Sequence, residues 1–209
     1  MIHIYYHIYA IDGVETIIDE QLNLIKSHFD FPYILNVGIS IGQDDKCITH
    51  ILNKFDNVRD VRARGNEFVT LDLIEKDKDK FGDSDYILYL HTKGASKQNL
   101  ENVISWRHLM NYFNIEKYKN IFKIFEKTDY NTYGVLLGSA GKWKLYSGNF
   151  WWAKASYLKT IKMDGVKKNR FNAEVDYIQN GVDWKPYSSY NREGENHYSI
   201  LFKKEEYAK

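Results

Sequence analysis

The first half of the chain alternates between short apolar runs and segments whose apolar positions recur at helical spacing. The apolar runs predict strands at 2–10, 31–39, 58–62 and 86–90. The segments between them predict helices at about 12–29, 44–55 and 68–80. This order is typical of a doubly wound, mostly parallel sheet with right-handed crossovers and helices on its faces.

The start of the first predicted helix carries its own signal. Asp12 would begin the helix, and Glu15, three residues later, would complete a capping box. The apolar positions that follow share one helical face and would form a buried stripe of Val14, Ile18, Leu22, Ile25 and Phe29.

The second half has a different pattern. Long helical patterning extends over 101–127, strands are predicted at 132–138 and 142–146, and short helices at 155–161 and 170–181. We expect Gly181 to end the last of these helices. No linker or repeat separates the halves, so we predict one α/β domain over residues 1–209, with halves of about 1–98 and 99–209.

The run Tyr86 to Leu90 shows no alternation, which is typical of a strand buried on both faces of a parallel sheet. It ends in the polar residues His91, Thr92 and Lys93. Ligands of open α/β sheets bind at the carboxyl ends of the strands, so we expect these three side chains to point into a site. An imidazole, a hydroxyl and an ammonium suit phosphate binding, although a surface turn would also contain such residues.

Two further basic positions fall on the same edge of the predicted sheet. Arg64-Gly-Asn-Glu67 follows the third strand, and Arg64 or Asn66 could hydrogen-bond a base or ribose. Arg107, early in the helix after the central strand, could reach a diphosphate with two hydrogen bonds. The alternatives are a polar turn at 64–67 and a solvated arginine.

Asp77-Lys-Asp79 is a DxD sequence, which could hold a divalent metal ion. It ends the helix that precedes the central strand, and that connection lies at the opposite edge of the sheet from the ligand crevice. We therefore favour a solvated, charged helix end.

Ser147-Gly-Asn-Phe-Trp-Trp152 is the most unusual stretch of the chain. Alternation suggests that either Trp151 or Trp152 faces the core and the other a ligand, with Asn149 as a polar contact to a sugar ring. Glu174 and Asp176 follow at a predicted helix start, and either could act as a general base. Core tryptophans and ordinary carboxylates of a helix first turn are the alternatives.

Composition mainly excludes function classes. The net charge of +1 gives no reason to expect a nucleic-acid or anionic-membrane partner. The single cysteine, Cys47, excludes an internal disulfide and fits a reducing, cytoplasmic location. The N-terminus does not read as a signal peptide, and no apolar run is long enough to span a bilayer. Neither GxGxxG nor GxxxxGK[ST] occurs, which argues against a Rossmann dehydrogenase and a P-loop NTPase.

These motifs resemble the GT-A class of nucleotide-sugar glycosyltransferases. Asp85-Tyr-Ile-Leu-Tyr-Leu-His-Thr-Lys93 is similar to that family's D-x-V-L-Y-L-D-x-D strand and loop. Ser147 to Trp152 resembles its acceptor-side turn, and Glu174-Val-Asp176 resembles its late acidic helix. The combination is similar to bacterial and large-virus glycan-building enzymes, especially the N-terminal domain of chlorovirus glycosyltransferases that modify the major capsid protein.

The resemblance implies a GT-A-like domain that transfers a sugar from a UDP-sugar to a hydroxyl of a glycan or glycoprotein. It implies a role in capsid glycosylation, in the host cytoplasm if the protein is viral. It assigns the nucleotide to the half 1–98 and the acceptor to the half 99–209. The residues that would bind the nucleotide sugar are His7, Tyr9, Ala10, Arg64, Asn66, His91, Thr92, Lys93, Arg107, Asn149, Trp151 and Trp152. The catalytic candidates are Lys93, Glu174 and Asp176, in an inverting or a retaining mechanism.

The sequence departs from the family at its metal-binding DxD, where His91-Thr92-Lys93 lacks both carboxylates. Three interpretations remain open for the usual Mn²⁺ or Mg²⁺. Lys93 could supply the charge itself. His91 and His197 could bind the metal. Asp77 and Asp79 could bind it despite their position. Two other functions also remain open, a noncatalytic glycan-binding module with a degenerate donor site and a nucleotidyltransferase.

Overall fold

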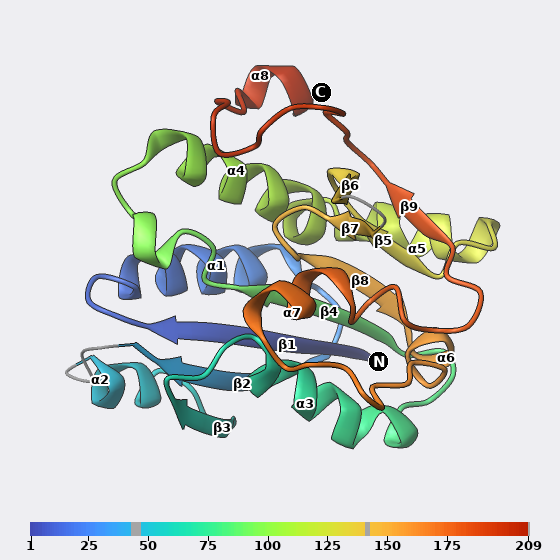
Figure 1. Ribbon diagram of the computed structural model, residues 1–209, viewed down its shortest axis with the longest axis horizontal. Coiled ribbons are helices and arrows are strands. Elements are labelled where there is room, and N and C mark those ends of the chain that lie inside the picture. The colour runs from blue at the N-terminus through green and yellow to red at the C-terminus, as the bar shows by residue number, and fades with distance from the viewer. Residues whose placement is uncertain (43–46, 141–142, 209) are drawn as a thin grey trace.

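The computed structural model describes residues 1–42, 47–140 and 143–208. Its centre is a seven-stranded sheet in the order β3-β2-β1-β4-β8-β5-β9 (Figure 1). The strands are β1 (Ile2–Ala10), β2 (Tyr33–Ile41), β3 (Val58–Ala63), β4 (Tyr86–His91), β5 (Thr132–Gly134), β8 (Trp151–Lys154) and β9 (Pro186–Ser188). Strands β1 to β4 are parallel, and β8 is antiparallel to both of its neighbours. The prediction of an α/β fold with a mostly parallel sheet is confirmed.

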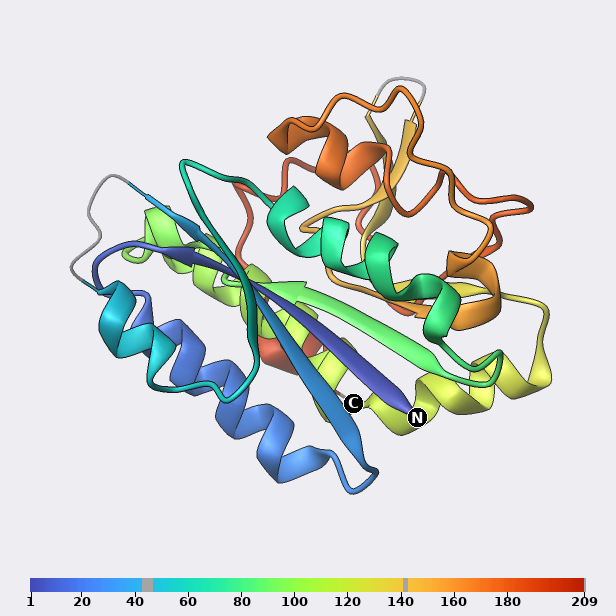
Figure 2. The same ribbon diagram turned by 90° about the horizontal axis from the view of Figure 1, so that it is seen from below.

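Helices cover both faces of this sheet (Figure 2). They are α1 (Glu15–His28), α2 (Ile48–Leu52), α3 (Phe68–Asp77), α4 (Glu101–Asn111), α5 (Tyr118–Lys127), α6 (Ala155–Leu158), α7 (Arg170–Val175) and α8 (Lys204–Tyr207). Helices α1, α2, α4 and α5 pack on one face, and α3, α6 and α7 pack on the other. Two apolar cores result, one on each side of the sheet.

Strand β4 confirms the prediction of burial on both faces. Leu88 and Leu90 point into the core beneath α1 and α4, whereas Ile87 and Tyr89 point into the core beneath α3. All four are completely buried. Because neither face meets solvent, an apolar side chain is stabilising at every position, and the period-two pattern disappears.

The predicted capping box at the first helix is wrong. Helix α1 begins at Glu15 and has no side-chain cap. Residues 11–14 instead form a turn in which the Val14 amide donates to the Ile11 carbonyl, with Gly13 at a φ of 77°. The Asp12 carbonyl accepts from Gln98 Nε2, so Asp12 belongs to the loop at the sheet edge. Helix α2 is shorter than predicted, and the first part of that prediction, at 44–46, lies outside the described residues.

The second half contains more breaks than its apolar pattern predicts. The long helix is interrupted by a π-helical turn at Tyr112–Glu116. The strand predicted at 132–138 is divided at Leu136, whose φ is 54°, so that β5 stays in the main sheet. Strands β6 (Leu137–Ala140) and β7 (Trp143–Tyr146) then form a separate hairpin. Helix α7 ends at Val175 and not at Gly181, so Glu174 and Asp176 stand at its end.

Candidate functional site

The chain reverses its winding direction between β1 and β4, which are neighbours in the sheet. Loops that leave such a switch point diverge, and the crevice between them is where open α/β sheets bind ligands. Here the loops are tied together by Thr92. Its amide donates to the His7 carbonyl at 3.0 Å, and its hydroxyl accepts from the Tyr9 amide at 3.0 Å. Thr92 thus holds the two strand ends together, and its side chain is buried.

A cavity of about 510 Å³ lies at the carboxyl ends of β1, β2 and β3, lined by Tyr9, Ile41, Gly42, Arg64 and Gly65. Tyr9 and Arg64 were both predicted to be binding residues, and the structure brings them together. The Arg64 side chain is exposed and, among the described residues, has no ion-pair partner. A Cβ on Gly65 would lie 2.7 Å from Val69 Cγ2, so the glycine permits the close turn that positions Arg64.

Three other residues predicted for the nucleotide do not face this cavity. Ala10 is completely buried. His7 is buried between the hydroxyls of Ser40, 2.9 Å away, and Thr70, 3.0 Å away. Desolvation lowers the pKa of His7 to about 3, so its ring is neutral. Asn66 accepts from the Phe68 amide and donates to the Lys168 carbonyl, and therefore fixes the start of α3. Ala10, His7 and Asn66 therefore have structural roles next to the cavity and do not line it.

Lys93 is only 8% exposed although it carries an ammonium group. Its Nζ lies 4.0 Å from the centre of the Trp106 ring and 5.4 Å from that of Tyr198. Within the part of the chain that the structure describes, no carboxylate forms an ion pair with it. Cation–π contacts compensate such a charge only in part, by about 0.5–2 kcal/mol. The site therefore contains a nearly buried positive charge that a bound anion could neutralise.

Arg107 does not reach into the site as predicted. Its Nε and Nη2 bind the two carboxylate oxygens of Glu20, at 3.1 and 2.9 Å, and its Nη1 donates to the Lys93 carbonyl at 3.1 Å. Each of its three nitrogens therefore has an internal acceptor, and one of them holds the loop after β4. Arg107 is a positioning residue for Lys93.

His91 and His197 are the residues that the sequence suggested as metal ligands. His91 Nε2 donates to the Gly148 carbonyl at 2.8 Å, which leaves Nδ1 without a proton. Desolvation, together with the charge of Lys93, lowers the pKa of His91 to about 3. His197 uses one ring nitrogen on Ser147 Oγ and the other on the Arg192 carbonyl, at 2.8 and 3.2 Å. Among the described residues, no group of three or more His, Cys, Asp and Glu side chains could hold a metal ion.

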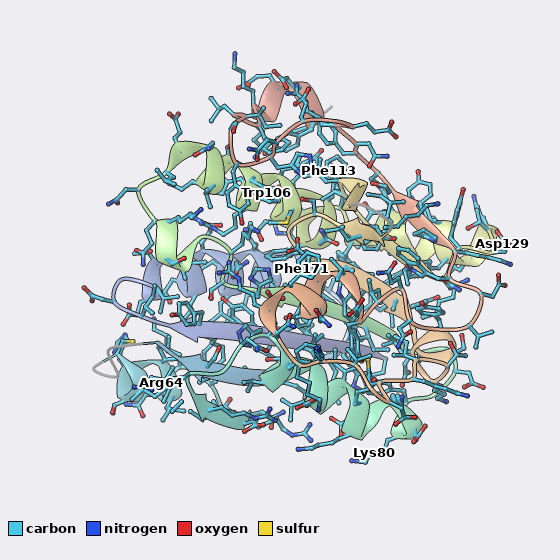
Figure 3. The ribbon with its side chains drawn as sticks, in the orientation of Figure 1. Arg64, Lys80, Trp106, Phe113, Asp129 and Phe171 are labelled. Carbon is cyan, nitrogen blue, oxygen red and sulfur yellow. The ribbon has the colours of Figure 1, made fainter. Side chains whose placement is uncertain are left out.

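Asp77 and Asp79 lie where the topology predicted, away from the candidate site. Asp77 accepts hydrogen bonds from Tyr5 and Arg59, both at 2.8 Å, and is nearly buried. Asp79 is exposed. Figure 3 shows Lys80, their neighbour, at the far end of α3 from Arg64. The interpretation as a solvated, charged helix end holds for Asp79 but is wrong for Asp77, which is nearly buried because Tyr5 and Arg59 cover it.

The turn Ser147–Asn149 lies against the end of β4 and is held from several elements. Gly148 and Asn149 both have a positive φ, of 93° and 54°. The Gly148 amide donates to Glu174 Oε1 at 2.9 Å. The Asn149 amide group donates to Glu67 Oε2 and to the Ala173 carbonyl, and its oxygen accepts from Trp151 Nε1. Asn149 therefore builds the turn and has little capacity left for a sugar.

The predicted aromatic wall is absent. Trp151 and Trp152 are both completely buried, on opposite faces of β8. Each indole nitrogen has an internal partner, Asn149 for Trp151 and the Asn114 carbonyl for Trp152. The alternation argument was correct about opposite faces. It failed because helices cover both faces of the sheet, so that both tryptophans are core residues and the expectation that one faces a ligand is wrong.

Two carboxylates converge on the Ser147–Asn149 turn. Glu174 uses Oε1 on Gly148, and no described contact uses its Oε2. Glu67, which sequence reasoning passed over, accepts from Tyr89 Oη at 2.9 Å and from Asn149. The signal for Glu67 was its place in the Arg64–Glu67 stretch directly after β3. Asp176, beyond the end of α7, has no comparable contact among the described residues.

The carboxyl edge therefore combines a cavity beside Arg64, an enclosed ammonium at Lys93, an unprotonated nitrogen at His91 and a carboxylate oxygen at Glu174. These groups can bind an anion, accept hydrogen bonds from hydroxyls and receive a proton. No curated protein matches the sequence. A family model described as a domain of unknown function, DUF8361, matches residues 3–200, so the chain belongs to the DUF8361 family.

Proposed function

We propose that the protein is a glycosyltransferase that moves a sugar from a UDP-sugar to a hydroxyl of a glycan. The observation that carries the proposal is Lys93. A nearly buried ammonium without a carboxylate partner is costly in an unliganded protein. The position of this ammonium, at the switch point of a parallel sheet, is where a diphosphate would bind.

The cavity beside Arg64 is where we propose that the nucleoside binds. Its volume of about 510 Å³ is within the usual range for small-molecule pockets. Tyr9 offers a ring for a base or ribose, and Arg64 offers a guanidinium that has no ion-pair partner among the described residues. The Tyr9 amide donates to the hydroxyl of Thr92, the residue before Lys93, so the strand end that lines the cavity is hydrogen-bonded to the loop that carries the ammonium.

In the proposed reaction, the acceptor oxygen forms a bond to the anomeric carbon of the donor sugar. The bond from that carbon to the diphosphate oxygen breaks, and its electron pair leaves with UDP. Lys93 stabilises the negative charge that develops on the diphosphate. In an inverting reaction, the free Oε2 of Glu174 takes the proton of the acceptor hydroxyl. In a retaining reaction, the same carboxylate stabilises the oxocarbenium-like centre.

The acceptor would bind at α7. Phe171 is 51% exposed on the helix that carries Glu174, and the two lie three residues apart, on neighbouring positions of one helical face. Phe171 is labelled on α7 in Figure 3. An exposed aromatic ring beside a carboxylate suits a sugar, which has an apolar face and hydroxyl groups. The capsid-linked glycan implied by the sequence resemblance is the acceptor that we propose.

The alternative of a noncatalytic glycan-binding module depended on an exposed aromatic wall at Trp151 and Trp152. Both rings are buried, which counts against such a wall, while the missing DxD remains the best support for this alternative. A nucleotidyltransferase is distinguished by its products. It would cleave the diphosphate and release a sugar phosphate or pyrophosphate, whereas a glycosyltransferase releases intact UDP.

The test is a thermal-shift titration with UDP, GDP, CDP and UDP-sugars, each in Mn²⁺ and in EDTA. A ligand at about 100 times its dissociation constant stabilises the folded state by roughly 2.7 kcal/mol, which is several degrees. We expect a shift with UDP that Lys93→Ala abolishes. The matched control is Lys80→Ala, which removes an exposed lysine at the opposite end of α3 and should leave the shift unchanged. Absence of a shift with every nucleotide would overturn the proposal.

A further inference from the structure

A second unpartnered donor lies next to Lys93. Trp106 Nε1 is buried and has no acceptor among the residues that the structure describes. Buried donors without partners are rare, because each costs about 1–3 kcal/mol. The same indole carries the Lys93 ammonium 4.0 Å above its ring. Two donors without acceptors therefore meet at Trp106 on α4: its own neutral indole N–H and the charged Lys93 ammonium above its ring.

A second ammonium lies close to the first. The Tyr198 ring packs edge-on against Trp106, with ring centres 5.0 Å apart. Lys97 Nζ lies 4.3 Å from the centre of that Tyr198 ring, and Lys93 Nζ lies 5.4 Å from it. Neither lysine has an ion-pair partner in the described ranges. Two ammonium groups held against one phenol ring without a carboxylate form a concentrated positive field.

The surrounding chain keeps this cluster in place. Arg107 holds the Lys93 carbonyl, and the Lys97 amide donates to the Gly94 carbonyl at 2.8 Å. Gly94 has a φ of 86°, and a Cβ there would lie 2.8 Å from Val103 Cγ1. Asn102 on α4 donates to the Tyr198 carbonyl. The short loop from β4 to α4 thus carries both lysines, and α4 anchors the segment that supplies Tyr198.

We propose that Lys93, Lys97 and Trp106 Nε1 form a diphosphate-binding site, with Tyr198 as its wall. This site deepens the proposed function, on which it rests for the identity of the ligand as the diphosphate of a nucleotide sugar. Charge-assisted hydrogen bonds from two ammonium groups and one indole would replace the present cation–π contacts. Such a site binds diphosphate without a divalent ion, because two lysines supply two positive charges.

The test uses inorganic pyrophosphate as the probe, with UDP measured in parallel by isothermal titration in EDTA. We expect pyrophosphate to bind the unaltered protein. Lys97→Ala should weaken it about tenfold, since a hydrogen bond to a charged group contributes about 1.5–3 kcal/mol. Trp106→Phe, which removes Nε1 and keeps an aromatic ring, should weaken it by a similar factor. The control is Lys127→Ala, an exposed lysine on α5.

The outcomes separate this site from the proposed function. Pyrophosphate binding that is unchanged by both Lys97→Ala and Trp106→Phe overturns the site, and so does a failure of pyrophosphate to bind. If UDP still binds in either case, the proposed function survives. If pyrophosphate binds with the expected dependence and UDP binds no more tightly than pyrophosphate, the anion site stands and the nucleotide-sugar function fails. Lys97 is exposed, so its variant tests the site even if Trp106→Phe unfolds the protein.

Discussion

Arg107 joins Lys93 to Glu20. One guanidinium nitrogen donates to the Lys93 carbonyl at 3.1 Å while two others bind the Glu20 carboxylate. Although desolvation opposes it, hydrogen bonds from His108 and Arg107 lower the pKa of Glu20 to about 2, so the pair is charged at neutral pH. A buried ion pair thus fixes the backbone on which the candidate anion-binding lysine stands.

Arg107→Ala should destabilise the fold and weaken donor binding together. Loss of one partner of a buried ion pair costs about 3–5 kcal/mol, and we expect about 3 because Glu20 is partly exposed. Urea unfolding measures the stability, and UDP titration measures the site. Arg192→Ala is the control, because Arg192 also forms ion pairs, with Glu195 and Glu206, but at the surface, where the cost is below about 1 kcal/mol. Equal effects of the two variants would contradict a special role for Arg107.

Glu174→Gln should lower turnover by a factor of about 10² to 10⁴, the usual contribution of a general base, while UDP affinity stays within about twofold. The amide oxygen can still accept from the Gly148 amide, so the turn should persist. Asp176→Asn is the matched comparison, two residues further along. If Asp176→Asn abolishes turnover and Glu174→Gln does not, the base has been assigned to the wrong carboxylate.

Phe171→Ala should raise the KM for a glycan acceptor by about fivefold and leave UDP affinity unchanged, because an aromatic stacking contact is worth about 1 kcal/mol. Phe171→Tyr should restore the acceptor affinity. Phe31→Ala is a close control, since Phe31 is 52% exposed and lies directly before β2, at the opposite edge of the sheet. A comparable rise in acceptor KM with Phe31→Ala would rule out a specific platform.

Stability should fall as the pH decreases from about 6.5 to 4.5. The pKa of His7 is about 3 in the folded protein and 6.5 in an ordinary environment, so the unfolded chain binds the extra proton first. Between pH 7 and pH 4.5 the contribution of His7 to the free energy of unfolding should therefore fall by about 2.7 kcal/mol, which corresponds to roughly two pH units below the pKa of the unfolded chain. Urea unfolding at a series of pH values measures the slope. His7→Gln should reduce it by about half, because the pKa of His91 is also lowered to about 3 and contributes the same dependence. An unchanged slope in that variant would assign the acid sensitivity to other groups.

The features that the sequence predicts well are those with local causes. The unbroken apolar run of β4 and the position of Arg64 after β3 follow from neighbouring residues. The failures come from contacts between distant segments. Trp151 and Trp152 are buried because β8 inserts between β4 and β5, and the contact of Glu67 with Asn149 spans 82 residues. No short sequence pattern contains that information. The prediction for Arg107 failed for the same reason, because its partner Glu20 lies 87 residues away.

The insertion of β8 next to β4 has a consequence for how the chain can be divided. Residues 1–98 contain four strands and look self-sufficient, but β8, from the second half, pairs along Tyr86 to Tyr89. A fragment truncated after residue 98 would expose that row of backbone donors and acceptors, together with the apolar faces of the strand. Such bare strand edges pair with copies of themselves. The fragment should therefore form insoluble assemblies, and the two halves should fold as one cooperative unit.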